Sequence, residues 1–189
     1  VPAPADEFVF DLGEMVTALP ELKLPAGQAS TVHLRSSEYV WNEEVAPGTH
    51  HAMHYPGAID PVPGAPGMIV CKRRSSSFMG TVAGTGHRGP IGMMTWSVVP
   101  PGGGAAAVFR PRFAMTVMRY VEVIGLDGPP TLDSLDAVVV HNDVPRTDVF
   151  ETSDPVLNGI YEAAVRSTLM NTQSMSWDNA TERNQTTWP

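Results

Sequence analysis

Cysteine is nearly absent from this sequence, since Cys71 is the single one among 189 residues. One cysteine excludes an intramolecular disulfide and a zinc site built from several cysteines. The chain must therefore be held together by packing, and its cysteine content leaves the redox compartment open. Because Cys71 ends the apolar run MIVC, we expect a buried, inert thiol there. We expect no cofactor and no metal.

Charged residues are also scarce, at 17%, and the basic ones are outnumbered. Twelve Lys and Arg against 20 Asp and Glu give a formal net charge of -8, which repels nucleic-acid phosphates and anionic lipids. We therefore expect neither nucleic acid nor a membrane as a partner. No apolar run reaches the roughly 18 residues of a membrane span, and the N-terminus VPAPADEF has no signal-peptide pattern. We expect a soluble chain from which any export signal is already absent.

Glycine and proline are frequent, at 17 and 18 residues, and interrupt the apolar pattern too often for long helices. Short alternating runs between them are typical of antiparallel strands, and a set of about eight to ten predicts a β-sandwich. The predicted strands lie in FVFDLGEMV, LPELKLPAG, STVHLRSSEYV, 68–71, 78–82, 93–99, 108–113, 115–124 and 135–141. Residues 45–66 are interpreted as a long surface loop, 100–104 as a turn, and 115–124 as a central strand because neither of its faces is purely polar.

The pattern changes to a helical one after Ser153. SDPVLNGIYEAAVRSTLMN opens with a capping residue and a proline, and then places Leu157, Ile160, Tyr161 and Ala164 at helical spacing. We predict a helix from about Asp154 to Met170. The chain thus divides into a β-sandwich domain, 1–150, and a second, incomplete unit, 151–189, whose apolar stripe needs a partner chain or a downstream segment to cover it.

Three other clusters have a simple interpretation. The histidines of THHAMHY (50–54) lack an acidic third ligand at a fixed spacing, so we expect loop histidines rather than a metal site. The basic cluster KRR (72–74) is more typical of a solvated turn than of an anion site. The glycines of AGTGHRGPIG (83–92) have no following Lys-Ser or Lys-Thr pair and no helix, so they are interpreted as a turn rather than a phosphate loop.

Two long runs follow one another, FRPRFAMTVMRYVEVIGL and AVVVHNDVPRTDVFETSDPVLNGIYEAAVRSTLMNTQS. In this order they resemble the junction between the β-sandwich and the catalytic barrel of bacterial α-L-rhamnosidases, and FVFDLGEMV resembles that family's phenylalanine-aspartate-glycine strand. The resemblance covers most of the chain and is best over 109–174. It implies an antiparallel β-sandwich followed by the first helix of an (α/α)6 barrel that continues beyond this chain. It also implies inverting hydrolysis of terminal L-rhamnose and, for a polysaccharide-degrading enzyme, a secreted or periplasmic location.

The resemblance also assigns candidate site residues in WDNATERNQTTW. Asp178 matches the family's catalytic acid, and Glu182 is the nearest match to the second sugar-contacting acid. Arg183 follows Glu182 directly and is a candidate substrate-binding residue. Trp177 and Trp188 flank the segment, and an indole face suits the apolar side of a sugar ring. The family's general base lies downstream in the barrel, so this chain alone is expected to be inactive, with a carbohydrate substrate and the rest of the barrel as its partners.

A shift of this alignment by one residue pairs Arg183 and Trp188 with the family's arginine and tryptophan, and it places Asn179 and Asn184 at the acid positions. On that alignment the family mechanism is lost. Two alternatives therefore stay open: a non-catalytic carbohydrate-binding or interaction module, and a relative with altered chemistry such as a lyase.

Overall fold

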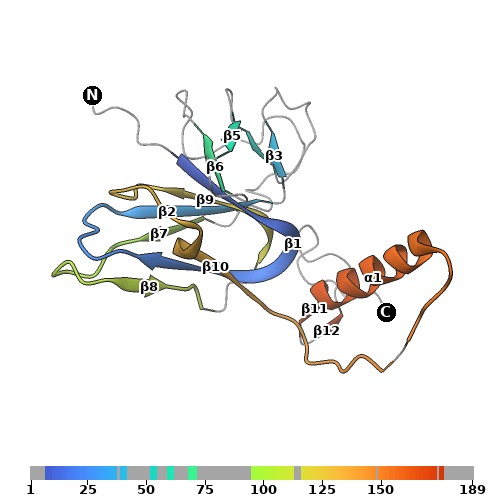
Figure 1. Cartoon of the computed structure of the whole chain (residues 1–189). Helices are drawn as coiled ribbons and strands as arrows, with labels where there is room; N and C mark the ends of the chain where they lie inside the picture. Colours follow the sequence, from blue (N-terminus) through green and yellow to red (C-terminus); the bar gives the residue numbers. More distant parts are fainter. Residues whose placement is uncertain are drawn as a thin grey trace, which may run out of the picture.

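The structure of the chain is a computed structural model. It describes residues 7–37, 39–41, 52–54, 59–61, 68–71, 95–112, 116–147, 149–173 and 175–176. Most of these residues form one curled antiparallel sheet, and a single α-helix lies beside it near the C-terminal end (Figure 1). None of the helices in the described part is long and apolar enough to cross a membrane. The predicted fold class, mainly antiparallel β followed by a helix, is confirmed.

The curled sheet has eight strands in the order β5-β6-β1-β9-β2-β7, with β8 and β10 also paired to β1. Its strands are β1 (Glu7–Leu24), β2 (Val32–Ser37), β5 (Ile59–Pro61), β6 (Met68–Cys71), β7 (Thr95–Val98), β8 (Ala107–Phe109), β9 (Thr116–Ile124) and β10 (Leu135–Val139). Outside this sheet, β3 (Tyr39–Trp41) and β4 (Ala52–His54) form a parallel pair. A short 3-10 helix, Leu132–Ser134, precedes β10.

Strand β1 is bent, so its two halves lie in different parts of the curled sheet. Its first half pairs with β6 on one side and β9 on the other, and its second half pairs with β10 and β8. The register against β9 shifts between Asp11 and Val16, where Gly13 adopts φ 82° and donates its N–H to Asp11 Oδ1 at 2.8 Å. We call residues 12–15 the elbow. The extra residues in the elbow curl the sheet, as β-bulges do.

Pro20 explains how β1 changes partners on one of its edges. Pairing with β9 ends at Ala18, and pairing with β8 begins at Leu22. Pro20 lies between these two positions, and it has no N–H that would need an acceptor. On this edge, the stretch of β1 between β9 and β8 has no partner strand, and Pro20 fits there because it has no N–H group to be left without a hydrogen bond.

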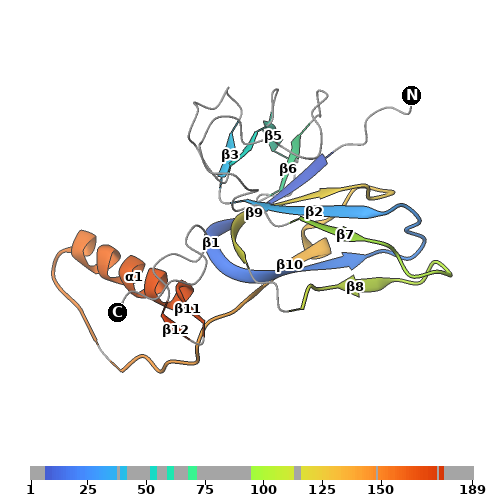
Figure 2. The same ribbon diagram turned by 180° about the vertical axis from the view of Figure 1, so that it is seen from behind.

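The hydrophobic core lies between the two layers. One layer holds β2, β7 and β9, and the other holds β8, β10 and the second half of β1 (Figures 1 and 2). Buried side chains from both layers form one cluster: Phe10, Val16, Ala18, Leu22, Leu24, Val32, Leu34, Val98, Met118, Val121, Val123 and Leu135. The curled sheet is thus a β-sandwich with its own core.

The opposite face of β9 carries a buried ion pair. Val121 and Val123 point into the core, so Glu122 between them points to the other face. Glu122 is fully buried, and its carboxylate meets the Arg35 guanidinium of β2 at 2.7 and 2.9 Å. Strand pairing places these two residues directly opposite each other. Their side chains thus form a polar cross-strand pair.

Several strand predictions are confirmed and two interpretations are wrong. β6, β7, β9 and β10 fall within predicted runs, and β9 is central, between β1 and β2. The runs FVFDLGEMV and LPELKLPAG, however, belong to one continuous strand, because the elbow and Pro20 are accommodated without ending it. Residues 45–66, interpreted as a loop, contain β4 and β5. The predicted strand 78–82, the KRR cluster (72–74) and the glycine-rich stretch (83–92) lie outside the described residues.

The predicted helix is also confirmed, as α1 (Pro155–Met170). Asp154 is its N-cap, and the Asp154 Oδ1 accepts a hydrogen bond of 2.8 Å from Val156 N. Pro155 occupies the first helical position, where its missing N–H and fixed φ suit the helix. Two very short strands, β11 (Thr172–Gln173) and β12 (Met175–Ser176), pair immediately after α1.

Candidate functional site

The region around α1 is the part of the described structure next to the predicted catalytic segment. Residues 140–153 connect β10 to α1, and we call them the strap. In Figure 1 the strap swings out from the sandwich and returns to the start of the helix. Strand β12 lies beside the other end of α1. The strap, α1 and the β11–β12 pair therefore set where the chain arrives before residue 177.

An exchange of hydrogen bonds fastens the end of the strap to the helix. Thr152 N and Thr152 Oγ1 donate to Asn158 Oδ1 at 2.8 and 2.9 Å, and Asn158 Nδ2 donates to Thr152 O at 2.9 Å. The amide of Asn158, in the first turn of α1, thus holds Thr152, the residue two positions before the N-cap Asp154. Asparagine suits this position because its side chain carries both donors and an acceptor.

A cluster of stacked and charged side chains holds the middle of the strap against α1. The Arg146 guanidinium donates to both carboxylate oxygens of Glu162, at 2.8 and 2.6 Å. It also lies 5.7 Å from the centroid of the Tyr161 ring, which stacks on Phe150 with 4.5 Å between ring centroids. The hydrogen bonds from Arg146 lower the pKa of Glu162 below its ordinary value. This cluster holds the strap against Tyr161 and Glu162 of α1.

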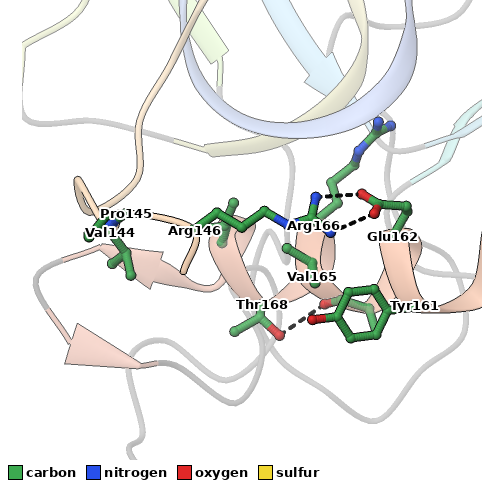
Figure 3. Close-up of a pocket in the computed structure, with 10 residues that line it drawn as sticks. Val144, Pro145, Arg146, Tyr161, Glu162, Val165, Arg166 and Thr168 are labelled. Atoms are coloured by element: carbon green, nitrogen blue, oxygen red, sulfur yellow. Dashed lines mark hydrogen bonds and ion pairs between the residues drawn. The ribbon is translucent and has the colours of Figure 1, made fainter. Parts of the chain in front are cut away.

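A groove of about 570 Å³ lies between the strap and the helix. Figure 3 shows the Arg146–Glu162 pair at this groove, with the side chains of Tyr161, Val165 and Thr168 around it. Its lining residues are Val144, Pro145, Arg146, Tyr161, Glu162, Ala164, Val165, Arg166, Thr168 and Leu169. Arg146 and Arg166 are paired with Glu162 and Glu14, respectively. The lining is mostly apolar and its cations are neutralised, so the groove suits an uncharged surface better than an anionic ligand.

The remaining side of α1 is apolar and exposed. No residue of the helix is buried. Val156, Leu157 and Ile160 are exposed by 66%, 48% and 60%, and Ala163 continues the same side as an exposed residue. The predicted stripe is therefore divided: Tyr161 packs on the strap, while Leu157, Ile160 and Ala164 do not contact the sandwich core.

The C-terminal end of α1 is tied to β1 at and beside the elbow. Arg166 forms an ion pair with Glu14 of the elbow. Thr17 Oγ1 donates to Met170 O at 2.7 Å, and Thr17 N donates to Met170 Sδ at 3.2 Å. Met170 also packs against the edge of the sandwich core. The sandwich thus fixes the last turn of α1.

The sequence-predicted site residues lie beyond these contacts. The candidate acids Asp178 and Glu182, the flanking Trp177 and Trp188, and Arg183 are outside the described residues, as are Asn179 and Asn184 of the shifted alignment. The last described residue before them is Ser176. For the metal interpretation, His50 and His51 are likewise outside, and only the backbone of His54 is described. Within the described part, no three His, Cys, Asp or Glu residues come together as a metal site would require.

The residues that join the strap to the helix were not predicted from the sequence. Arg146 and Glu162 are 16 positions apart and Thr17 and Met170 are 153 apart. Neither separation follows a helical or strand period, so no periodic signal marks these pairs. The one local signal was the Asp154-Pro155 start of the helix, which correctly predicted where the strap ends.

Comparison with known proteins relates this chain to α-L-rhamnosidases. No family model matches it. A 53-residue segment is 42% identical to an α-L-rhamnosidase of Streptomyces avermitilis, which is 28% of this chain and 5% of that relative. The solved structure of the α-L-rhamnosidase from Dictyoglumus thermophilum matches with a TM-score of 0.61 and 21% identity, over 91% of this chain and 15% of that one. The chain therefore spans a small part of these proteins. It resembles α-L-rhamnosidases in sequence over a short segment and in fold over most of its length.

Proposed function

We propose that this chain is the N-terminal part of a rhamnosidase-like glycoside hydrolase. Residues 1–150 are its β-sandwich domain, and residues 151–189 begin an (α/α)6 catalytic barrel. The observation that carries the proposal is that the fold likeness to a rhamnosidase covers 91% of the chain. The segment of 42% identity to a second rhamnosidase is independent support.

The exposed side of α1 supports the continuation into a barrel. A 16-residue helix with Val156, Leu157 and Ile160 open to water gains little from its own packing. Because these side chains are already partly covered, burying the rest of each would contribute on the order of 1–2 kcal/mol. In the proposed enzyme, further helices of the barrel cover this side, and they come from a downstream segment or a separate chain.

The chemistry proposed for the complete enzyme is inverting hydrolysis of terminal L-rhamnose-type glycosides. Such enzymes place two carboxyl groups roughly 6.5–9.5 Å apart, one as general acid and one as the base that activates water. Asp178 is the proposed acid, Glu182 holds a sugar hydroxyl, and Trp177, Arg183 and Trp188 contact the substrate. The base comes from outside this chain, so the 189 residues alone are inactive.

The test is hydrolysis of aryl α-L-rhamnosides by the complete gene product. Asp178→Asn should lower kcat by about 10²–10⁴-fold, the usual contribution of a general acid, with the fold unchanged. Glu182→Gln should act mainly on KM. Asp143→Asn, in the exposed part of the strap, is the matched control and should retain the parental rate. Parental turnover by Asp178→Asn would remove Asp178 from the mechanism.

A second candidate is a carbohydrate-binding or interaction module without hydrolase activity, or a relative with altered chemistry such as a lyase. The alignment that places Asn179 and Asn184 at the acid positions favours it, because an amide cannot donate the proton of a carboxylic acid. Calorimetric binding of rhamnose-capped oligosaccharides, without release of rhamnose, would support the module. Release of an unsaturated sugar would support the lyase.

A further inference from the structure

The end of α1 is joined to the sandwich by a small network that centres on Thr17. This β1 residue is 1% exposed, and each of its polar groups has a partner. Its hydroxyl donates to Met170 O at 2.7 Å, its N–H lies 3.2 Å from Met170 Sδ, and its carbonyl accepts from Val140 N at 2.9 Å. One buried residue thus contacts both the beginning of the strap and the end of the helix.

Gln173 completes the network from the other side. It is 4% exposed, and its Nε2 donates to Met170 O and to Val140 O. Asn142 N donates to Thr172 O at 2.8 Å, which ties the same short segment to the strap. Met170 O therefore accepts from both Thr17 and Gln173. The last carbonyls of a helix have no partner within the helix, and the carbonyl of Met170 finds its partners in these two side chains.

The chain that leaves this network enters the short β11–β12 pair. Gln173 pairs with Met175, and Thr172 with Ser176, in the β11–β12 turn. Asp178 follows Ser176 by two positions in the sequence. A shift of Met170 would therefore move the start of the segment that carries Asp178, and displacements of about 1 Å at a catalytic group lower rates strongly.

We infer that Thr17 is a positioning residue: through Met170 and Gln173, this sandwich residue sets where the chain leaves α1 and so aligns the segment that carries the proposed acid. The catalytic part of the inference rests on the proposed function, whereas the mechanical part does not. It gives the β-sandwich a role in the reaction beyond support.

Three variants of the complete gene product test the inference. Thr17→Val removes the hydroxyl and keeps the branched shape, and Gln173 still donates to Met170 O, so the fold should persist. Thr17→Ser keeps the hydroxyl and should behave as the parent. Thr116→Val is the matched control, because Thr116 is a buried strand residue whose hydroxyl, among the residues that the structure describes, donates to the neighbouring Val117 O at 3.3 Å.

The first measurement is amide hydrogen exchange by mass spectrometry over residues 169–176. Loss of one hydrogen bond should raise exchange there about fivefold in Thr17→Val, and leave it unchanged in Thr17→Ser and Thr116→Val. The second measurement is aryl rhamnoside turnover, where Thr17→Val should lower kcat about three- to tenfold at constant KM, with rescue by Thr17→Ser.

The outcomes separate this inference from the proposed function. Unchanged exchange in Thr17→Val overturns the inference. Raised exchange with parental kcat overturns its catalytic part. An inactive parent overturns the proposed function, and the exchange result still decides whether Thr17 holds the chain after α1.

Discussion

The sandwich and the helical region are stabilised in different ways. In the sandwich, side chains from two layers bury one another, and Leu22, Leu34 and Val121 are fully buried. In α1 no side chain is buried, and the helix is held by the Thr152–Asn158 hydrogen bonds, the Arg146 cluster and the contacts with Thr17. Apolar burial stabilises roughly in proportion to area, whereas exposed ion pairs contribute little. The sandwich therefore has a hydrophobic core of its own, whereas α1 exposes apolar side chains that no part of the described structure covers.

The largest expected effect is a loss of stability when a leucine is replaced by alanine in the sandwich, compared with the same replacement in α1. Leu22→Ala should destabilise the chain by about 2–5 kcal/mol, because it removes a fully buried side chain and leaves a cavity. Leu157→Ala should change stability by less than about 0.5 kcal/mol, because Leu157 is 48% exposed. Urea unfolding followed by circular dichroism measures both.

Repeating Leu157→Ala in the complete gene product sharpens the comparison. If barrel helices cover α1, the cost there should approach that of a core leucine. Equal costs for Leu22 and Leu157 in the 189-residue chain would contradict the division into a cored sandwich and an uncovered helix. An equally small cost for Leu157 in both proteins would contradict a covered helix in the complete one.

A smaller effect, of opposite sign in the two regions, is expected for glycine. Gly125 follows β9 with φ 90°, and a Cβ there would lie 2.5 Å from Thr31 O. Gly125→Ala should therefore destabilise the sandwich by about 1–3 kcal/mol. Gly159, in α1, has open space around it, so Gly159→Ala should stabilise the helix by about 0.5–1 kcal/mol.

Thermal melting measures the first glycine substitution, and hydrogen exchange within α1 measures the second. The informative result is the direction of each stability change, a decrease for Gly125→Ala and an increase for Gly159→Ala. Destabilisation of α1 by Gly159→Ala would mean that this part of the helix already packs against a neighbour. A neutral Gly125→Ala would mean that the turn after β9 adapts easily, in contrast to the close backbone approach at Thr31.

The sequence pattern predicted those elements whose signals are local. The cap and proline at 154–155 fixed the start of α1, and the mixed faces of 115–124 indicated a central strand, which β9 is. The single strand β1 was not predictable in the same way. Gly13 and Pro20 are turn signals on their own, and only pairing with β9, β10 and β8 keeps the chain extended through them.

The candidate site was predicted from a resemblance and not from a pattern. Asp178 and Glu182 stay predictions, since they lie outside the described residues. The contacts that lead up to them, such as Thr17 with Met170, join residues far apart in the sequence. Partners of this kind depend on how strands and helices pack, and no spacing rule specifies them.

The smallest expected effect is the loss of stability at acid pH. Each region contains an arginine-bound carboxylate whose pKa is lowered, Asp11 in the sandwich and Glu162 in α1. Burial raises the pKa of Asp11, but hydrogen bonds from Arg119 and from Gly13 N outweigh burial, and the pKa lies below its ordinary value of 3.8. In α1, the hydrogen bonds from Arg146 lower the pKa of Glu162 below 4.5. Both carboxylates therefore stabilise the folded chain above these ordinary values, and both contributions are lost as the pH falls through the lowered pKa values.

Asp11→Asn and Glu162→Gln separate the two regions in this acid range. Asp11→Asn should flatten the decline of sandwich stability below about pH 4, because an amide has no proton to take up. Glu162→Gln should leave the melting of the sandwich unchanged and flatten only the acid dependence of hydrogen exchange in α1. Melting temperatures and exchange rates between pH 3 and 7 measure these effects. If Glu162→Gln instead changed the acid melting of the sandwich, the helix and the sandwich would unfold as one unit, and their separate stabilisation would be disproved.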